Sequence, residues 1–179
     1  MEPVKRVKAE ALSQQLRQGS GNFLEQRRGI VVLSLGALGC MALIGLYQMG
    51  IIKHLPEPPL PGLDADKVDA SAEAYSYFST PDAFLGLGSY AATMGLAAMG
   101  GQDHSRTQPW IPLALAAKAG FDAFQAAKLT YDQYAKHRAA CVWCLIAAAT
   151  TWASAALVVP EAKAALREVQ KRRSSGRTR

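Results

Sequence analysis

Three long apolar runs place the strongest limit on the fold of this chain. Residues 29–52 and 139–159 contain no charged side chain, and residues 82–101 carry a charge only at Asp82. A helix needs about 20 apolar residues to cross the hydrocarbon core of a bilayer, and each run meets that length. Half of the residues are hydrophobic although the formal net charge is +6, so the charges gather outside these runs. We expect each run to form a transmembrane helix.

A fourth segment, residues 110–134, is largely apolar but contains Lys118, Asp122, Lys128 and Asp132. Charges are costly in lipid, yet residues four apart share a helix face and can neutralise one another. The segment is either a span, with Lys118–Asp122 facing the bundle interior and Lys128–Asp132 near an end, or an amphipathic helix beside the membrane. We favour the span. The predicted fold is all-α, a membrane four-helix bundle with four transmembrane helices.

The segments that flank the runs differ in charge. Residues 1–28 have three more basic than acidic side chains, residues 161–179 have five more, and residues 53–82 have four more acidic than basic. Lys- and Arg-rich flanks stay in the cytoplasm. We expect a basic cytoplasmic segment 1–28, a transmembrane domain 29–160 with loop 53–81 outside, and a basic cytoplasmic tail after Pro160, which closes the last span. The expected location is a bacterial inner membrane.

The basic tail has two interpretations. It either binds anionic lipid headgroups or only fixes the orientation of the chain in the membrane. No aromatic residue interrupts its basic residues, which argues against a nucleic-acid partner. Membrane lipid is the partner that this composition predicts.

The loop after the first run begins with a Pro-rich stretch, residues 55–62, which should be extended. Residues 64–78 follow with the spacing of a short helix, and Pro81 suits the first turn of the next helix. The loop is either a lid over the mouth of the bundle or an ordinary solvated connector.

Cys141 and Cys144 form a Cys-x-x-Cys pair near the start of the last apolar run. Such a pair can close into a disulfide, and the helix dipole would stabilise the thiolate of Cys141. The orientation above places the pair on the outer, oxidising side, where disulfides persist. Cys40 lies alone within the first run. We expect no metal site, because one cysteine pair and scattered histidines cannot supply four zinc ligands.

Three neighbours of the pair have two interpretations each. His137 and Arg138 either add positive charge near Cys141 or anchor the helix at the membrane interface, and the anchoring is the simpler explanation. Trp143 is an interfacial aromatic residue, a wall of a cofactor pocket, or both.

The order of these motifs resembles the vitamin K epoxide reductase family. The matching elements are residues 79–88 (STPDAFLGLG) opening the second span, residues 128–131 (KLTY) ending the third, and residues 137–144 (HRAACVWC) opening the fourth. The resemblance covers residues from about 28 to 160. It implies a four-helix bundle around a quinone of the ubiquinone or menaquinone type, with the Cys-x-x-Cys as the active-site pair.

The resemblance also implies individual roles. Cys144 would be the thiol nearer the quinone, and Cys141 would exchange with a partner's thiols. Asp82 and Phe84, together with Leu85, fall near family positions that contact the quinone, and Trp143 is a candidate wall of the same pocket. These residues make a quinone-dependent thiol–disulfide oxidoreductase the expected enzyme.

The chain departs from the family pattern in its loop. Family members usually carry two further cysteines there as an electron shuttle, whereas residues 53–82 contain none. We therefore expect the thiols of a partner, such as an extracytoplasmic thioredoxin-like protein, to reach Cys141 directly. The alternative function is a non-catalytic membrane scaffold or assembly subunit that keeps the fold, since cysteines also pack well as apolar residues.

Overall fold

The computed structural model describes residues 3–177, and within them the chain is helical with no β-strand. This confirms the all-α prediction. The long helices are α1 (Pro3–Gln18), α2 (Leu24–Gln48), α4 (Asp82–Ala98), α6 (Trp110–Asp132) and α7 (Val142–Arg177). The short elements are α3 (Ala65–Asp69), the 3-10 turn η1 (Ala72–Tyr75), α5 (His104–Thr107) and the π-helical turn η2 (Gln133–His137).

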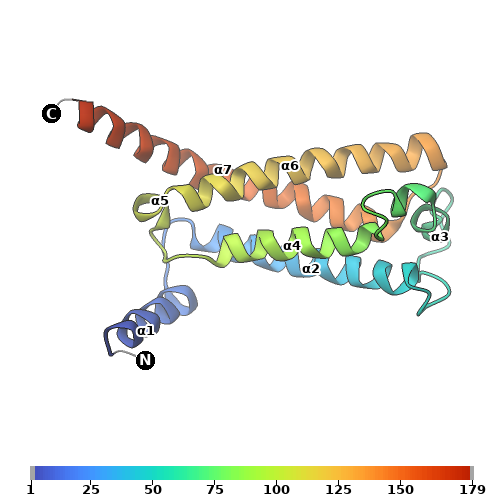
Figure 1. Cartoon of the computed structure of the whole chain (residues 1–179), viewed down its shortest axis with the longest axis horizontal. Helices are drawn as coiled ribbons and strands as arrows, with labels where there is room; N and C mark the ends of the chain where they lie inside the picture. Colours follow the sequence, from blue (N-terminus) through green and yellow to red (C-terminus); the bar gives the residue numbers. More distant parts are fainter. Residues whose placement is uncertain (1–2, 178–179) are drawn as a thin grey trace.

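Four helices, α2, α4, α6 and α7, lie side by side as a bundle (Figure 1). Helix α2 packs against α4 and α7, and α6 packs against α7 and α4. Helix α1 projects away from one end of this bundle, which we call the terminal end because both chain termini lie there (Figure 1). The segment that contains α3, and the turn between α6 and α7, lie at the opposite end, the loop end.

Among the described residues, two helical segments are long and apolar enough to cross a membrane, Leu24–Gln48 and Val142–Ser175. Large apolar side chains face outward from the bundle: Val32 and Leu35 on α2 and Phe124 on α6 are all more than half exposed. Lipid is the solvent in which such a surface is stable. Membrane crossing by α4, which has 17 residues, and by the charged α6 stays a prediction.

Small residues allow the helices to approach closely, the usual packing in lipid. Gly45 on α2 faces the ring of Phe84, and a Cβ added at Gly86 on α4 would lie 2.6 Å from the sulfur of Met41. A Cβ at Gly45 would make an ordinary contact with Phe84, whereas one at Gly86 would require the Met41 side chain to move.

The charged pairs of α6 lie where the sequence predicts. Lys118 is bound within the bundle by Asp122 (2.5 Å) and by the α4 hydroxyls of Ser89 (2.9 Å) and Thr93 (2.8 Å). The second pair, Lys128–Asp132 (3.2 Å), is more exposed and lies at the loop end. Lys118 and Asp122 thus face the bundle interior, as expected.

Helix α7 does not end at Pro160, contrary to our expectation, but continues to Arg177. A proline inside a helix loses one hydrogen bond and favours a break. Here the segment beyond it is held by packing, because Ala165 is fully buried and the buried Glu161 carboxylate lies 2.7 Å from the buried imidazole of His104, the first residue of α5. These contacts outweigh the lost backbone bond.

The first bundle helix begins at Leu24, earlier than expected, and takes in Arg27. The Arg27 side chain is buried and donates hydrogen bonds to the carbonyls of Ala97 (2.8 Å), Met99 (2.8 Å) and Gly101 (2.9 Å). Because the last carbonyls of a helix lack backbone donors, Arg27 satisfies the end of α4. It is a structural cation of the bundle rather than part of a solvated basic flank.

Candidate functional site at the loop end

Part of the loop covers the start of α7. Residues 55–64, which we call the covering segment, join it through three hydrogen bonds. The amide of Ala140 donates to the Gly62 carbonyl (2.9 Å), the amide of Asp64 donates to the Ala140 carbonyl (3.1 Å), and the indole of Trp143 donates to the Pro56 carbonyl (2.8 Å). Cys141 lies beneath with no exposed surface.

The remainder of the loop is less regular than expected. The predicted helix over residues 64–78 is split into α3 and η1. Asp64 caps α3 by accepting a hydrogen bond from the Lys67 amide (2.9 Å), as an N-cap residue does. Helix α3 ends with Asp69 pointing into the bundle, where its carboxyl group is buried.

The two cysteines are free thiols at the start of α7: Cys141 directly precedes the helix, and Cys144 lies in its first turn. The amide of Cys144 donates to the sulfur of Cys141 (3.3 Å), and the Cys141 amide donates to the side-chain oxygen of Gln133 (3.0 Å). Cys141 thus occupies the helix N-terminus, as its sequence position predicts. Cys144 is half-buried and therefore the more accessible of the two.

Asp69, a residue that the sequence analysis did not single out, lies beside the two cysteines. A ligand atom from each of Asp69, Cys141 and Cys144 lies within 4.8 Å of the other two. The Cys144 thiol donates to Asp69 Oδ1 (3.5 Å), while Asp69 Oδ2 is buried without a hydrogen-bond partner. Burial raises the pKa of Asp69 to about 6. A carboxyl group in this state can exchange a proton with the neighbouring thiol near neutral pH.

Gln48, at the end of α2, fixes the surroundings of Asp69. Its amide nitrogen donates to Asp82 Oδ1 (2.7 Å) and to the Asp69 carbonyl (3.2 Å), and its oxygen accepts from the Ala83 amide (3.3 Å). One side chain therefore holds the ends of α2 and α3 and the start of α4 together.

A cavity of about 470 Å³ opens beside this group of residues. Its lining is mainly apolar and includes Cys144 and Asp69, and it extends between α4 and α6. Two of the predicted quinone-contacting residues, Asp82 and Leu85, line it. The size and apolar character suit a flat aromatic or quinoid ring.

The other two predicted pocket residues lie elsewhere. Phe84 packs against Gly45 of α2, because it points to a different face of α4 from Leu85. Trp143 packs against the buried residues around Ile44 and Cys141 and binds the covering segment. Neither is among the residues that line the cavity.

The two basic candidates beside the pair also separate. The His137 imidazole lies 3.9 Å from the Glu73 carboxylate and lines the mouth of the cavity. Arg138 is exposed and has a left-handed backbone conformation (φ 49°) in the turn between α6 and α7. Only His137 therefore faces the cavity.

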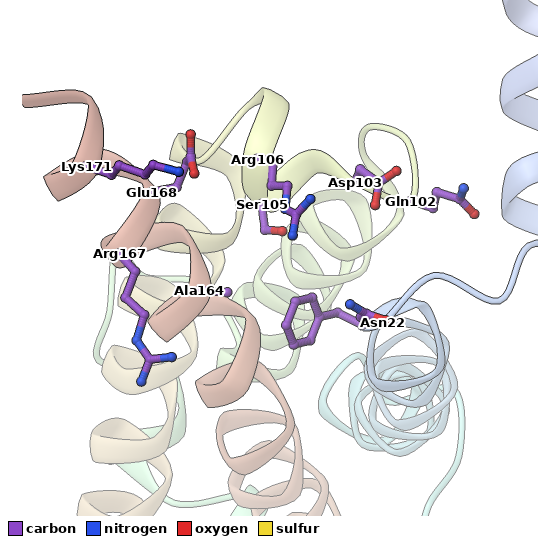
Figure 2. Close-up of a pocket in the computed structure, with 10 residues that line it drawn as sticks. Asn22, Gln102, Asp103, Ser105, Arg106, Ala164, Arg167, Glu168 and Lys171 are labelled. Carbon is purple, nitrogen blue, oxygen red and sulfur yellow. The ribbon is translucent and has the colours of Figure 1, made fainter. Parts of the chain in front are cut away.

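A second hollow, of about 340 Å³, lies at the terminal end (Figure 2). Basic side chains from α5 and α7, Arg106, Arg167 and Lys171, line it together with the acidic Asp103 and Glu168. This hollow is remote from the cysteines. Its lining carries charges of both signs and less apolar surface than the lining of the loop-end cavity. We therefore place the candidate site at the loop end.

Comparison with known proteins identifies a family for most of the chain. The model of the vitamin K epoxide reductase family matches residues 29–159. The chain belongs to this family. The matched range contains both cysteines, Asp69 and the helices that enclose the cavity, and it leaves out α1 and the end of α7. Together with the apolar helices, family membership identifies a membrane protein of the thiol–disulfide oxidoreductase type. No curated protein and no solved structure matches the chain.

The same three atoms could also hold a metal ion. Two thiolates and a carboxylate are ligands that zinc accepts, but they are one fewer than a closed structural zinc site uses. A disulfide needs both sulfurs free of metal, so redox chemistry and metal binding are alternative uses of these three residues.

Proposed function

We propose that this protein exchanges electrons between the Cys141–Cys144 pair and a quinone bound in the loop-end cavity. The observation that carries the proposal is the position of Cys144, which both lines the cavity and contacts Cys141 behind it. A quinone supplies an acceptor for two electrons and two protons. The balance is two thiols and one quinone giving one disulfide and one hydroquinone, and the reverse is equally allowed.

The residues of the chain fit these roles. Asp69 acts as the base that accepts the proton of the Cys144 thiol, to which it is hydrogen-bonded, as the sulfur reacts at the cavity. Cys141, held at the helix N-terminus, supplies the second sulfur of the disulfide. Asp82 and Leu85 contact the bound ring from α4, with the ubiquinone or menaquinone class as the expected ligand.

The substrate thiols of a partner must reach this pair without a relay in the loop. Because Cys141 is fully covered, direct exchange requires the covering segment to lift from the start of α7. A thioredoxin-like partner on the same side of the membrane would then meet Cys141. We place that side outside the cytoplasm, with four spans and both basic termini inside.

The redox state of the pair in membranes tests the proposal. After reduction and removal of the reductant, a maleimide mass tag counts the free thiols before and after a short-chain quinone is added. We expect two tags to be lost with quinone and none without it. Cys144→Ala should abolish the loss, whereas Cys40→Ala should not, because Cys40 is packed in the bundle interior with Ala37 and Ala147.

The scaffold alternative predicts the opposite result. A subunit that only keeps the fold needs neither coupled thiols nor a bound quinone. If the Cys141 and Cys144 thiols stay reduced with every quinone tested, the oxidoreductase proposal is wrong and the scaffold alternative replaces it.

A further inference from the structure

The cavity reaches beyond the cysteines to a polar patch between α4, α6 and α7. Four of its lining residues form this patch, which we call the inner wall: Ser89, Tyr90, Asp122 and Thr151. Lys118 lies behind the wall and is paired with Asp122. Charged residues inside a membrane bundle are costly and usually mark a functional site.

The hydrogen-bond donors at the inner wall are already engaged. Lys118 has three N–H donors, and three oxygens lie within 2.9 Å of its nitrogen: Ser89 Oγ, Thr93 Oγ1 and Asp122 Oδ2. The Ser89 hydroxyl donates to Asp122 Oδ1 (3.2 Å).

The remaining two hydroxyls are engaged as well. Thr151 donates to the Ala147 carbonyl (2.8 Å), and the Tyr90 hydroxyl lies 2.9 Å from Thr151 Oγ1 and 3.2 Å from the same carbonyl. Each hydroxyl has one proton to donate. A ligand at the inner wall therefore meets no spare donor among these four residues.

Acceptor capacity remains at the same place. An ionised carboxylate offers about four acceptor positions, and the hydrogen bonds of Asp122 with Lys118, Ser89 and Thr93 occupy three of them. At the other end of the cavity, Asp69 Oδ2 is a second acceptor atom without a partner. Gln125, one helix turn from Asp122, can serve a carbonyl or a hydroxyl alike and does not discriminate between them.

We propose that Asp122 accepts a hydrogen bond from a hydroxyl of the hydroquinone form, so that the cavity binds the hydroquinone more tightly than the quinone. A quinone oxygen is only an acceptor and gains nothing from Asp122, whereas a hydroquinone hydroxyl donates. Lys118 is the positioning residue that holds the carboxylate at the wall. This inference rests on the proposed function and adds to it the redox form that the site selects.

The preference has a consequence for electron flow. Hydrogen bonds to ionised groups are stronger than those between neutral groups, so we expect the hydroquinone to bind about tenfold tighter or more. Tighter binding of the reduced form makes the bound quinone a stronger oxidant, by about 30 mV for each tenfold preference. The site would therefore favour oxidation of Cys141 and Cys144 over their reduction.

Binding of the two redox forms tests the inference without turnover. In the full chain carrying Cys144→Ala, dissociation constants are measured anaerobically by tryptophan fluorescence for short-chain ubiquinone and menaquinone and for their quinols. For whichever of ubiquinone and menaquinone binds better, we expect the quinol to bind about tenfold tighter, or more, than the corresponding quinone. Asp122→Asn should bring the ratio close to one, because asparagine presents a donor as well as an acceptor.

Asp132→Asn is the matched control. Asp132 is on the same helix, lines the mouth of the same cavity and is also paired four residues away, but it contacts two lysines, Lys128 and Lys136, near solvent. It should leave the ratio unchanged. If Asp122→Asn does not fold, Lys118→Met combined with Asp122→Leu replaces the pair by apolar side chains of similar size and should also abolish the preference.

The outcomes separate the two proposals. Equal binding of quinone and quinol would overturn the role of Asp122. So would a decrease in the ratio of their dissociation constants that is as large with Asp132→Asn as with Asp122→Asn. Either result leaves the oxidoreductase proposal standing. Failure of both forms to bind removes the quinone site itself, and both proposals fall.

Discussion

At the scale of single residues, the cysteines could be found from the sequence and Asp69 could not. A Cys-x-x-Cys pair at the start of an apolar run is a local pattern, and its place at the N-terminus of α7 follows from that pattern. The loop contains six acidic residues over residues 53–82, and nothing local distinguishes the one that is buried. Only the packing of α3 against the bundle selects Asp69.

Burial of Asp69 makes stability depend on pH. Its pKa of about 6 in the folded chain exceeds the ordinary value of 3.8. The folded chain therefore keeps a proton that the unfolded chain has released, and stability falls as pH rises between about 4 and 6. Two pKa units correspond to about 3 kcal/mol. Asp69→Asn should remove this fall, so that the variant is more stable than the parent at pH 7 and equal to it at pH 4.

Thermal unfolding in detergent at pH 4, 5, 6 and 7 measures the effect. The same variant should also slow quinone-dependent loss of thiols above pH 6, where the parent has a carboxylate to take the Cys144 proton. If the unfolding temperatures of parent and variant change with pH in the same way across this range, Asp69 is not the buried acid we describe.

At the scale of elements, the four bundle helices could be predicted because each is a separate apolar run, but their ends could not. The bounds depend on tertiary contacts. Arg27, on α2, donates to a carbonyl at the end of α4, and the buried Glu161 and Ala165 stabilise α7 beyond Pro160. From the sequence, the basic residues predicted a later start for α2 and the proline predicted an earlier end for α7. The covering segment is likewise a tertiary feature, which the Pro-rich sequence left open between lid and connector.

The covering segment should control access to Cys141. Trp143→Phe removes the indole donor to Pro56, which is worth about 1 kcal/mol, so the segment should open about fivefold more often. With Cys40 and Cys144 both replaced by alanine, the rate at which iodoacetamide alkylates Cys141 reports this opening.

Trp152→Phe is the control for that experiment. Trp152 also donates its indole proton to a carbonyl, that of Ala123 (3.1 Å), but far from the segment. Its loss should leave the alkylation rate unchanged. If Trp143→Phe behaves like Trp152→Phe, the segment is not what shields Cys141.

At the scale of the whole molecule, charge and architecture agree. Both basic ends lie at the terminal end of the bundle, and the acidic loop with α3 and the turn that leads into α7 lie at the other (Figure 1). An even number of crossings produces such an arrangement, and the proposed four spans are one such number. The cavity could not be predicted, because residues from α2, α4, α6, α7 and the loop enclose it together.

The stoichiometry of quinone reduction tests the central claim most directly. Reduced protein, freed of reductant, is titrated anaerobically with a short-chain quinone while the absorbance of the quinone is followed. The account predicts one hydroquinone formed for each Cys141–Cys144 pair, and none with Cys144→Ala. Absence of hydroquinone from the parent protein, with both thiols still reduced at the end of the titration, would contradict it.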